Sequence, residues 1–336
     1  MKNKQGVCLV TGGAGFIGSH VTDELIKLGY QVVVLDNLSG GFLRNINSKA
    51  IFIKGSINNQ KLIDNIFTKY KFDYVFHLAA YAAEGLSPFI RHFNYQNNLI
   101  GSINLINASI KHHIKKFIFT SSIAVYGTNQ TPMVETLTPE PEDPYGISKY
   151  AIELDLKSAN KLFGLNYTIF RPHNVYGERQ NHGDPYRNVL GIFINNILQN
   201  KPLTIFGDGN QQRAFTYIKD VTPYIAQSIS NFKTDNQIIN IGSDTPYTVN
   251  QLAKIIIDNF DQKINIDYLP ARQEVYQAYS DHSKAKQIFN IKSFTDINQG
   301  IKNMIKSAQK LGPIHPKKFK NIEIEDKLPP SWAKLK

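Results

Sequence analysis

A glycine-rich turn close to the N-terminus constrains the fold of this chain more than any other feature. The apolar run Val7 to Val10 is typical of a buried parallel strand, and the sequence TGGAGFIG at residues 11–18 follows it directly. A helical pattern begins at the end of this turn. Gly12, Gly15 and Gly18 permit a tight turn, a close approach of the backbone to a pyrophosphate, and close packing of the helix on the strand. This strand–turn–helix unit predicts a dinucleotide-binding fold.

An acidic residue at the end of the next strand supports this interpretation. The run Gln31 to Leu35 is followed by Asp36, which lies 18 residues after Gly18. A carboxylate at this position accepts hydrogen bonds from the ribose hydroxyls of an adenosine and repels a 2′-phosphate. The next residues, 37–39, contain no arginine. The sequence therefore predicts NAD, rather than NADP, as the cofactor.

Strand and helix patterns alternate over the first half of the chain, which is typical of a doubly wound, Rossmann-like parallel sheet. We expect an α/β fold with an NAD-binding domain at residues 1–170, to which a segment near 214–240 returns. Turn-rich residues 171–311 predict a smaller C-terminal α/β substrate domain, and residues 312–336 a C-terminal extension that packs as a strap or stays mobile. The remaining strand patterns cover residues 51–53, 74–78, 117–120 and 167–170, and the main helical patterns cover 61–68, 98–112 and 145–163.

Composition and charge exclude several classes of protein. The chain of 336 residues has 38 lysines and arginines against 27 aspartates and glutamates, a net charge of +11, but its basic residues are scattered. A nucleic-acid partner is therefore not expected. The single cysteine, Cys8, excludes a disulfide framework and a zinc site built on cysteine pairs, and no metal site is predicted. Because no apolar run is long enough to span a membrane and the N-terminus is polar, we expect a soluble, cytoplasmic protein.

The segment YGISK at residues 145–149 places a phenol and an ammonium group one helical turn apart. Asp143 is suited to cap this helix and Pro144 to occupy its first position, so Tyr145 and Lys149 lie on the first turns of one face. The ammonium group and the positive charge of NAD⁺ favour the phenolate, which predicts Tyr145 as a base near neutral pH. Upstream, the hydroxyl side chains of residues 120–122 end a predicted strand, where open α/β sheets bind ligands.

Together these motifs resemble the extended short-chain dehydrogenase/reductase family, and within it the NAD-dependent nucleotide-sugar 4-epimerases of the UDP-glucose 4-epimerase type. The resemblance covers essentially the whole chain. Besides the glycine turn and the YGISK segment, it rests on DNL at 36–38, HLAA at 77–80, NNLIGS at 97–102, SSIAVYG at 121–127, RPHNVYG at 171–177, FGDG at 206–209 with Arg213, and PAR at 270–272.

The resemblance implies a role for each matching residue. Tyr145 is implied to be the acid/base, Lys149 to bind the nicotinamide ribose, and Ser122 to bind the 4-oxygen of the sugar. The cofactor residues implied in addition to Tyr145 and Lys149 are Gly12, Gly15, Phe16, Ile17, Gly18, Asp36, Asn37, Ser39, Ser56, Ile57, Leu78, Ala79, Ala80 and Asn98. The substrate residues implied, with Ser122, are Asn174, Asn188, Val189, Phe206, Arg213, Arg272 and Ala278, the two arginines being suited to anchor a diphosphate.

Ser56 departs from the family pattern, which usually has an aspartate that contacts adenine in this loop. A serine hydroxyl can still form a hydrogen bond there. Ala278 aligns with a position beside the sugar that varies between tyrosine and smaller residues, and an alanine leaves room for a 2-acetamido group.

The residues after Ser122 separate the reactions known in the family. Related dehydratases and decarboxylases place acidic side chains there, whereas this chain has Ile123 and Ala124, which cannot transfer protons. The resemblance therefore implies inversion at C4 of a UDP-hexose or UDP-N-acetylhexosamine through a 4-keto intermediate. Epimerisation of a UDP-uronic acid is the first alternative. A UDP-glucuronate decarboxylase or nucleotide-sugar dehydratase is a less favoured one. An NAD-sensing protein without activity is disfavoured because Ser122, Tyr145 and Lys149 are all present.

The resemblance also implies a homodimer in which two helices of each subunit form a four-helix bundle. The helices would be those at residues 98–112 and 145–163, with Leu99, Ile103 and Ile106 at suitable spacing on the first.

Overall fold

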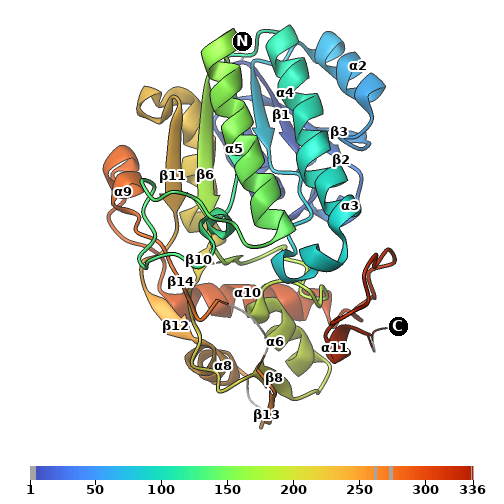
Figure 1. Ribbon diagram of the computed structural model, residues 1–336, viewed down its shortest axis with the longest axis vertical. Coiled ribbons are helices and arrows are strands. Elements are labelled where there is room, and N and C mark those ends of the chain that lie inside the picture. Colours follow the sequence, from blue (N-terminus) through green and yellow to red (C-terminus); the bar gives the residue numbers. More distant parts are fainter. Residues whose placement is uncertain (1–4, 261–262, 272–274, 334, 336) are drawn as a thin grey trace.

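A seven-stranded parallel sheet forms the larger part of the molecule (Figure 1). The computed structural model describes residues 5–260, 263–271, 275–333 and 335. The strands lie in the order β11-β6-β5-β4-β1-β2-β3, so the doubly wound fold class predicted from the sequence is confirmed. Their bounds are β1 (Val7–Thr11), β2 (Gln31–Asp36), β3 (Ile51–Lys54), β4 (Tyr74–His77), β5 (Lys116–Thr120), β6 (Tyr167–Pro172) and β11 (Gln237–Ile241).

Helices cover both faces of this sheet. One face is covered by α2 (Gln60–Tyr70), α4 (Gly101–Lys111) and α5 (Pro144–Phe163), and the other by α1 (Phe16–Lys27), α7 (Thr222–Gln227) and α9 (Ser283–Phe289). Because both faces are buried, the strands are almost continuously apolar, as in the VCLV run of β1. Alternate residues of β1 point to opposite layers: Leu9 packs with the α2, α4 and α5 layer, and Cys8 and Val10 pack with α1.

The longest helix, α5, begins as its sequence predicts. The carboxylate of Asp143 accepts hydrogen bonds from the backbone N–H groups of Tyr145 (2.8 Å) and Gly146 (3.0 Å), and Pro144 occupies the first turn. The helix ends at Gly164, which adopts the left-handed conformation. This start fixes Tyr145 and Lys149 at the end of α5 that lies nearest the smaller part of the molecule (Figure 1).

A smaller C-terminal part packs below the strand ends of the large sheet. Three small sheets, β12-β9-β14, β13-β8 and β10-β7, surround a second apolar core with α6, α8 and α10. The bounds are β7 (Val175–Tyr176), α6 (Val189–Leu198), β8 (Leu203–Phe206), β9 (Gln212–Ala214), β10 (Thr216–Tyr217), β12 (Pro246–Thr248), α8 (Val249–Ile257), β13 (Ile266–Leu269), β14 (Gln277–Ala278) and α10 (Ile297–Leu311).

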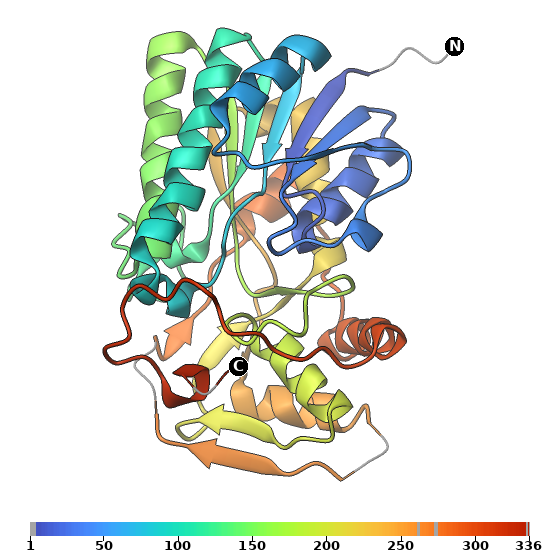
Figure 2. The same ribbon diagram turned by 90° about the vertical axis from the view of Figure 1, so that its right-hand side faces the viewer.

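The segment after α10 runs as an extended strap across the junction of the two parts and ends in α11 (Pro330–Ala333) (Figure 2). On one side, the Ile314 backbone bonds to the Asn195 side chain of α6 at 2.8 and 3.0 Å. On the other, the Glu323 carboxylate accepts from the backbone N–H groups of His92 and Phe93 in α3 (Arg91–Tyr95), both at 2.8 Å. The ring of Trp332 packs in an apolar cluster with Leu86 and Ile90.

Among the helices of the described residues, none is both long and apolar enough to cross a membrane.

Candidate active site

The glycine turn forms a cradle that side chains would fill. Gly12 has φ +73°, and a Cβ there would lie 2.7 Å from the backbone nitrogen of Ala79, in the loop after β4. A Cβ on Gly18 would lie 2.2 Å from the carbonyl oxygen of Gly12. Gly15 caps α1 without any side-chain hydrogen bond, so the first N–H groups of α1 face the turn. These features fit the diphosphate of a dinucleotide.

Asp36 lies at the end of β2, beside this turn. Its carboxylate accepts hydrogen bonds from the backbone N–H groups of Ala14 (3.0 Å) and Leu38 (2.7 Å). Burial raises the pKa of Asp36, and these backbone hydrogen bonds act in the opposite direction. The carboxylate is thus fixed one strand away from the glycine turn, where it is suited to accept from ribose hydroxyls.

The other predicted cofactor residues also lie at the carboxyl ends of the parallel strands. Phe16 and Ile17 begin α1, Asn37 and Ser39 are exposed in the loop after Asp36, Ser56 and Ile57 follow β3, and Leu78, Ala79 and Ala80 follow β4.

Asn98 is buried in the helical turn Gln96–Ile100, directly before α4. Its side chain is hydrogen-bonded to the backbone N–H (2.8 Å) and carbonyl (3.1 Å) of Tyr81 and to the side chain of Asn94 (2.7 Å). It therefore orients the loop after β4, and we expect its effect on the cofactor to act through that loop.

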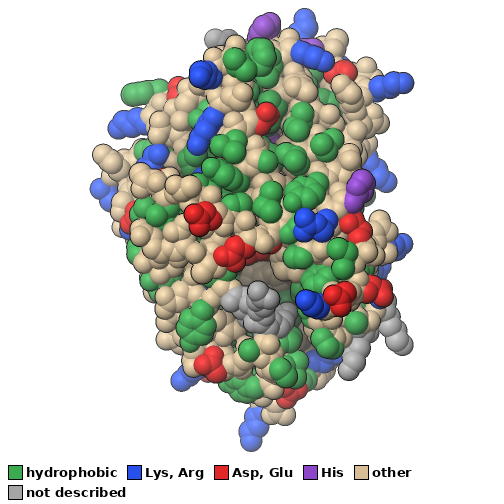
Figure 3. Space-filling view, viewed as in Figure 1, with side chains coloured by type: hydrophobic (Ala, Val, Ile, Leu, Met, Phe, Trp, Pro, Cys, Tyr) green, Lys and Arg blue, Asp and Glu red, His purple; other side chains and the backbone are tan. Residues whose placement is uncertain are grey.

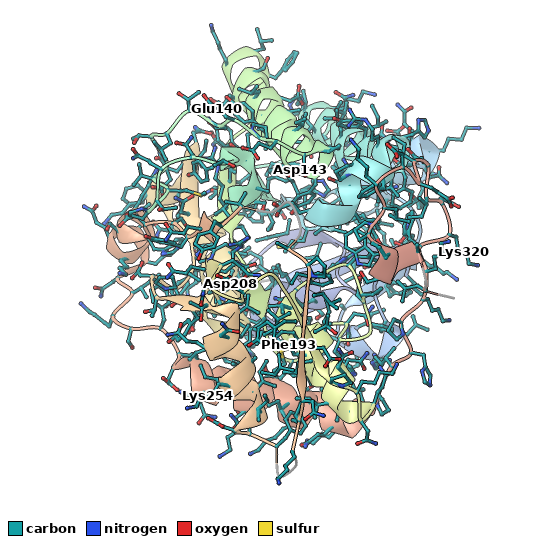
Figure 4. All side chains as sticks on the ribbon, turned by 60° about the horizontal axis from the view of Figure 1, so that its bottom comes forward. Glu140, Asp143, Phe193, Asp208, Lys254 and Lys320 are labelled. Carbon is teal, nitrogen blue, oxygen red and sulfur yellow. The ribbon has the colours of Figure 1, made fainter. Side chains whose placement is uncertain are left out.

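Ser122, Tyr145 and Lys149 are brought together where β5 ends and α5 begins. The hydroxyls of Ser122 and Tyr145 are hydrogen-bonded. The Lys149 Nζ donates to the backbone carbonyl of Thr120 at 2.7 Å and lies 5.8 Å from the centre of the Tyr145 ring. Figure 4 shows Asp143, the cap of α5, on the side of this junction that faces the smaller part. A base, a hydroxyl donor and an ammonium group thus share one small volume.

Burial controls the protonation of Tyr145 and Lys149 in the protein alone. Burial raises the pKa of Tyr145 above its ordinary value, and the hydrogen bond with Ser122 only partly opposes this effect. Burial also lowers the pKa of Lys149 to about 7, against the opposite influence of Glu153. Desolvation of both side chains therefore dominates in the protein alone, and Tyr145 as a base beside bound NAD⁺ stays a prediction.

Several of the predicted substrate residues lie in or next to the smaller part of the molecule. Asn174 follows β6, and its amide donates to the Ala214 carbonyl at 3.1 Å. Asn188 caps α6, directly before Val189, and Phe206 ends β8. Figure 4 shows Asp208, two residues after Phe206, and Phe193 of α6 on this side of the molecule.

Arg213 lies in β9 and pairs with Ala278 of β14. Its guanidinium donates to backbone carbonyls in residues 275–276, including that of Tyr276 at 3.1 Å. Ala278 also packs in an apolar cluster with Ile123, the residue after Ser122. Arg272, the second predicted anchor, lies outside the described residues. A hollow at the junction of the two parts opens on the face shown in Figure 3.

A buried ionic network behind the site was not predicted from the sequence. Glu153, one turn after Lys149 on α5, accepts from Arg171 of β6 at 2.9 Å and from the hydroxyl of Ser121 at 2.5 Å. Two features of the sequence could have indicated this network: the i,i+4 spacing of Lys149 and Glu153, and Arg171 inside the RPHNVYG motif. No group of three or more side chains suited to hold a metal occurs within the described ranges.

Known proteins resemble this chain over most of its length. The NAD dependent epimerase/dehydratase family matches residues 8–242. A Methanocaldococcus jannaschii protein, provisionally named as a UDP-glucose 4-epimerase, is 40% identical over 302 residues, which cover 88% of this chain and 96% of that protein.

Two solved structures are also similar. The UDP-glucose 4-epimerase of Thermotoga maritima, solved with UDP-glucose, has a TM-score of 0.86 and 38% identity, covering 91% of this chain and 99% of that one. The UDP-N-acetylglucosamine 4-epimerase of Methanobrevibacter ruminantium, in complex with UDP-N-acetylmuramic acid, has a TM-score of 0.84 and 34% identity, covering 90% and 98%.

Proposed function

The chain belongs to the NAD-dependent epimerase/dehydratase family, and from that premise we propose that it inverts C4 of a UDP-hexose or UDP-N-acetylhexosamine through a 4-keto sugar. The observation that carries this proposal is the grouping of Ser122, Tyr145 and Lys149 at the same edge of the sheet as the glycine turn and Asp36, with no acidic side chain directly after Ser122. The matched relatives named for 4-epimerases support the same reaction.

NAD is the cofactor of this enzyme, and it supplies a hydride acceptor and donor for C4 of the sugar. The glycine turn and the start of α1 would hold its diphosphate, and Asp36 its adenosine ribose. The loop after β4 and Lys149 would hold the nicotinamide end, because both lie at the strand ends next to Tyr145.

Tyr145 takes the proton of the 4-hydroxyl. It returns a proton to the 4-oxygen after the sugar has rotated to present its other face. Ser122 donates to the 4-oxygen and opposes the growth of charge on it. In the protein alone, burial keeps the Tyr145 phenol protonated, so a positive charge beside the ring is required to release its proton. The cationic form of Lys149 is held by the Thr120 carbonyl and by the field of Glu153, and it contributes part of that charge.

Elimination and decarboxylation are disfavoured by the side chains beside Ser122. Ile123 and Ala124 are apolar and buried, so neither supplies the additional acid or base that loss of water requires. We therefore expect the 4-keto sugar to be reduced from its other face.

The substrate must be held by its nucleotide while its sugar rotates. Arg213 lies in β9, Asn174 donates to the carbonyl of its neighbour Ala214, and Asn188 and Val189 begin α6. We expect Arg213 and Arg272 to bind the diphosphate and Phe206 to pack against the base. The proposal also includes a homodimer and a cytoplasmic location, the latter supported by Cys8, a buried free thiol.

The proposal is tested by incubating the purified protein with UDP-glucose, UDP-N-acetylglucosamine and UDP-glucuronate, without added NAD, and resolving the products by NMR. We expect the C4 epimers of the first two to form. Tyr145→Phe is expected to lower kcat by at least ~10² while leaving UDP binding unchanged. Conversion of UDP-glucuronate alone would favour the uronate alternative, and a product that has lost water or carbon dioxide would contradict the proposal.

A further inference from the structure

The loop between β7 and α6 directs one arginine toward the cofactor side of the molecule. The Nη2 of Arg187 lies 3.9 Å from the position that a Cβ would take on Gly40. Gly40 belongs to the loop after Asp36, and its neighbour Gly41 packs so closely on the glycine turn that a Cβ there would lie 2.7 Å from the backbone of Ala14. Arg187 therefore reaches, from the smaller part, a loop that flanks the diphosphate cradle.

Arg187 also contacts the loop after β4. Its guanidinium carbon lies 4.7 Å from the centre of the Tyr81 ring, and the guanidinium donates a hydrogen bond to the Tyr81 hydroxyl. Tyr81 directly follows Ala80, and its backbone is the segment that Asn98 holds in place. One side chain from the smaller part thus lies between two strand-end loops that line the predicted NAD site.

The ion pair of Arg187 with Asp184 is made through Nε. Asp184 lies 3.1 Å from Nε, and the same carboxylate accepts from the Tyr186 backbone at 3.0 Å, which holds the loop in shape. Of the other two nitrogens, Nη2 is the one that lies near the Gly40 loop. The positive charge also acts at the reaction centre, because it opposes the effect of burial on the pKa of Tyr145.

The negative charge of the cofactor diphosphate favours a positive group near its binding site. Residues 11–18, 36–43 and 78–90, at the strand ends next to the diphosphate cradle, contain no lysine or arginine, although Arg44 and Arg91 directly follow the last two ranges. A diphosphate carries two negative charges, and the backbone N–H groups of a helix start supply only a partial positive charge. A guanidinium fork is suited to phosphate oxygens.

We infer that Arg187 is a further cofactor-binding residue, which binds the diphosphate of NAD from the smaller part of the molecule and slows its release. This inference rests on the cofactor site and not on the sugar reaction. The C-terminal strap holds the loop that carries Arg187, since the Tyr186 hydroxyl accepts from the Phe319 backbone at 2.9 Å and its ring lies 5.2 Å from Trp332.

The test measures the exchange of bound NAD in the purified holoenzyme against an excess of labelled NAD. For Arg187→Gln we expect exchange about ten- to a hundredfold faster than in the wild type, because one charge-assisted interaction is lost. Arg187→Lys keeps the charge but loses the forked guanidinium, so its NAD exchange rate should lie between those of the wild type and Arg187→Gln. Arg179→Gln is the matched control, since Arg179 lies in the same loop but pairs with Asp23 of α1 at 2.7 Å, and its exchange should equal that of the wild type.

Calorimetric titration of each holoenzyme with UDP identifies which diphosphate Arg187 serves. Unchanged UDP affinity together with faster NAD exchange supports the inference. Weakened UDP binding with unchanged NAD exchange would overturn it, and so would unchanged NAD exchange in Arg187→Gln. If Arg187→Gln fails to fold, the rate for Arg187→Lys decides. A wild-type protein that binds and exchanges NAD but has no epimerase activity would contradict the proposed function. It would leave this inference standing.

Discussion

Glu153 of α5 and Arg171 of β6 form an ion pair in which both side chains are buried, with 0% and 1% of their side-chain surface exposed. The pair joins the helix that carries Tyr145 and Lys149 to the sheet, and the Arg171 guanidinium also lies 4.6 Å from the centre of the Tyr126 ring. Removal of one partner leaves an uncompensated buried charge, which costs about 3–5 kcal/mol.

We therefore expect Arg171→Met to lower the free energy of unfolding by about that amount, measured by urea unfolding. The double variant Glu153→Leu with Arg171→Met should recover most of the loss, because neither charge is then left unpaired. A double variant as unstable as the single one would show that the pair contributes through something other than charge compensation.

The pKa of Lys149 predicts a dependence of stability on pH. Burial lowers this pKa from 10.5 to about 7, so between these two pH values the unfolded chain binds a proton that the folded chain does not. The free energy of unfolding should therefore rise with pH across this window, by up to about 1.4 kcal/mol per pH unit. Below pH 7 both states bind the proton, so Lys149 adds no further pH dependence there and its burial lowers the free energy of unfolding by a constant amount.

Lys149→Met removes this titration. We expect the unfolding free energy of the cofactor-free variant to lack that slope when both proteins are measured at pH 6, 7, 8 and 9. Parallel curves for the wild type and Lys149→Met would mean that the folded protein keeps Lys149 charged throughout the range.

Asp36 is expected to determine the choice of cofactor. Asp36→Asn keeps the shape of the side chain but removes the charge that repels a 2′-phosphate, so the ratio of NAD to NADP affinity should fall by at least about tenfold. Equilibrium binding of both cofactors measures this ratio. Asp23→Asn removes a carboxylate from α1 that pairs with Arg179 instead, and it should leave the ratio as it is.

The apolar surface of α5 is expected to form the dimer interface. Ile147 and Leu154 are 39% and 47% exposed on this helix, and Ile100 beside it is 43% exposed. Apolar side chains gather over α4 and α5 on the face shown in Figure 3. Ile106, which the sequence placed in this interface, is instead buried in the core between α4 and the sheet, because it lies on the inner side of the helix.

Leu154→Glu should therefore convert a dimer into a monomer at micromolar concentration, as measured by light scattering. Phe232→Glu is the control, since Phe232 is 78% exposed outside the patch on α4 and α5. A wild-type monomer, or a dimer that survives Leu154→Glu, would contradict this interface.

Local patterns were sufficient to predict the glycine turn, Asp36 and the cap of α5, because each depends on residues close together in the sequence. The sequence also indicated that a later segment returns to the first domain, but not that β11 pairs with β6, some 70 residues earlier. Contacts such as that of Arg187 with Tyr81 depend on how two separate parts of the chain pack. Burial raises the pKa of Tyr145 in the protein alone, and a pattern of spacing carries no information about burial.

Ala278 is expected to determine the size of sugar that the enzyme accepts. Ala278 lies in β14, where it pairs with Arg213 of β9, and it packs against the apolar cluster that contains Ile123, the residue after Ser122. A small side chain there leaves room for a 2-acetamido group, whereas a tyrosine ring would fill that space. Wild-type enzyme should therefore convert UDP-N-acetylglucosamine as well as UDP-glucose, and Ala278→Tyr should lower the ratio of their kcat/KM values by at least about tenfold. Gln277→Tyr is the matched control, because Gln277 is exposed and neighbouring strand residues point to opposite faces. If the wild type already rejects the acetamido sugar, or if Ala278→Tyr and Gln277→Tyr change the ratio equally, another residue controls the choice of sugar.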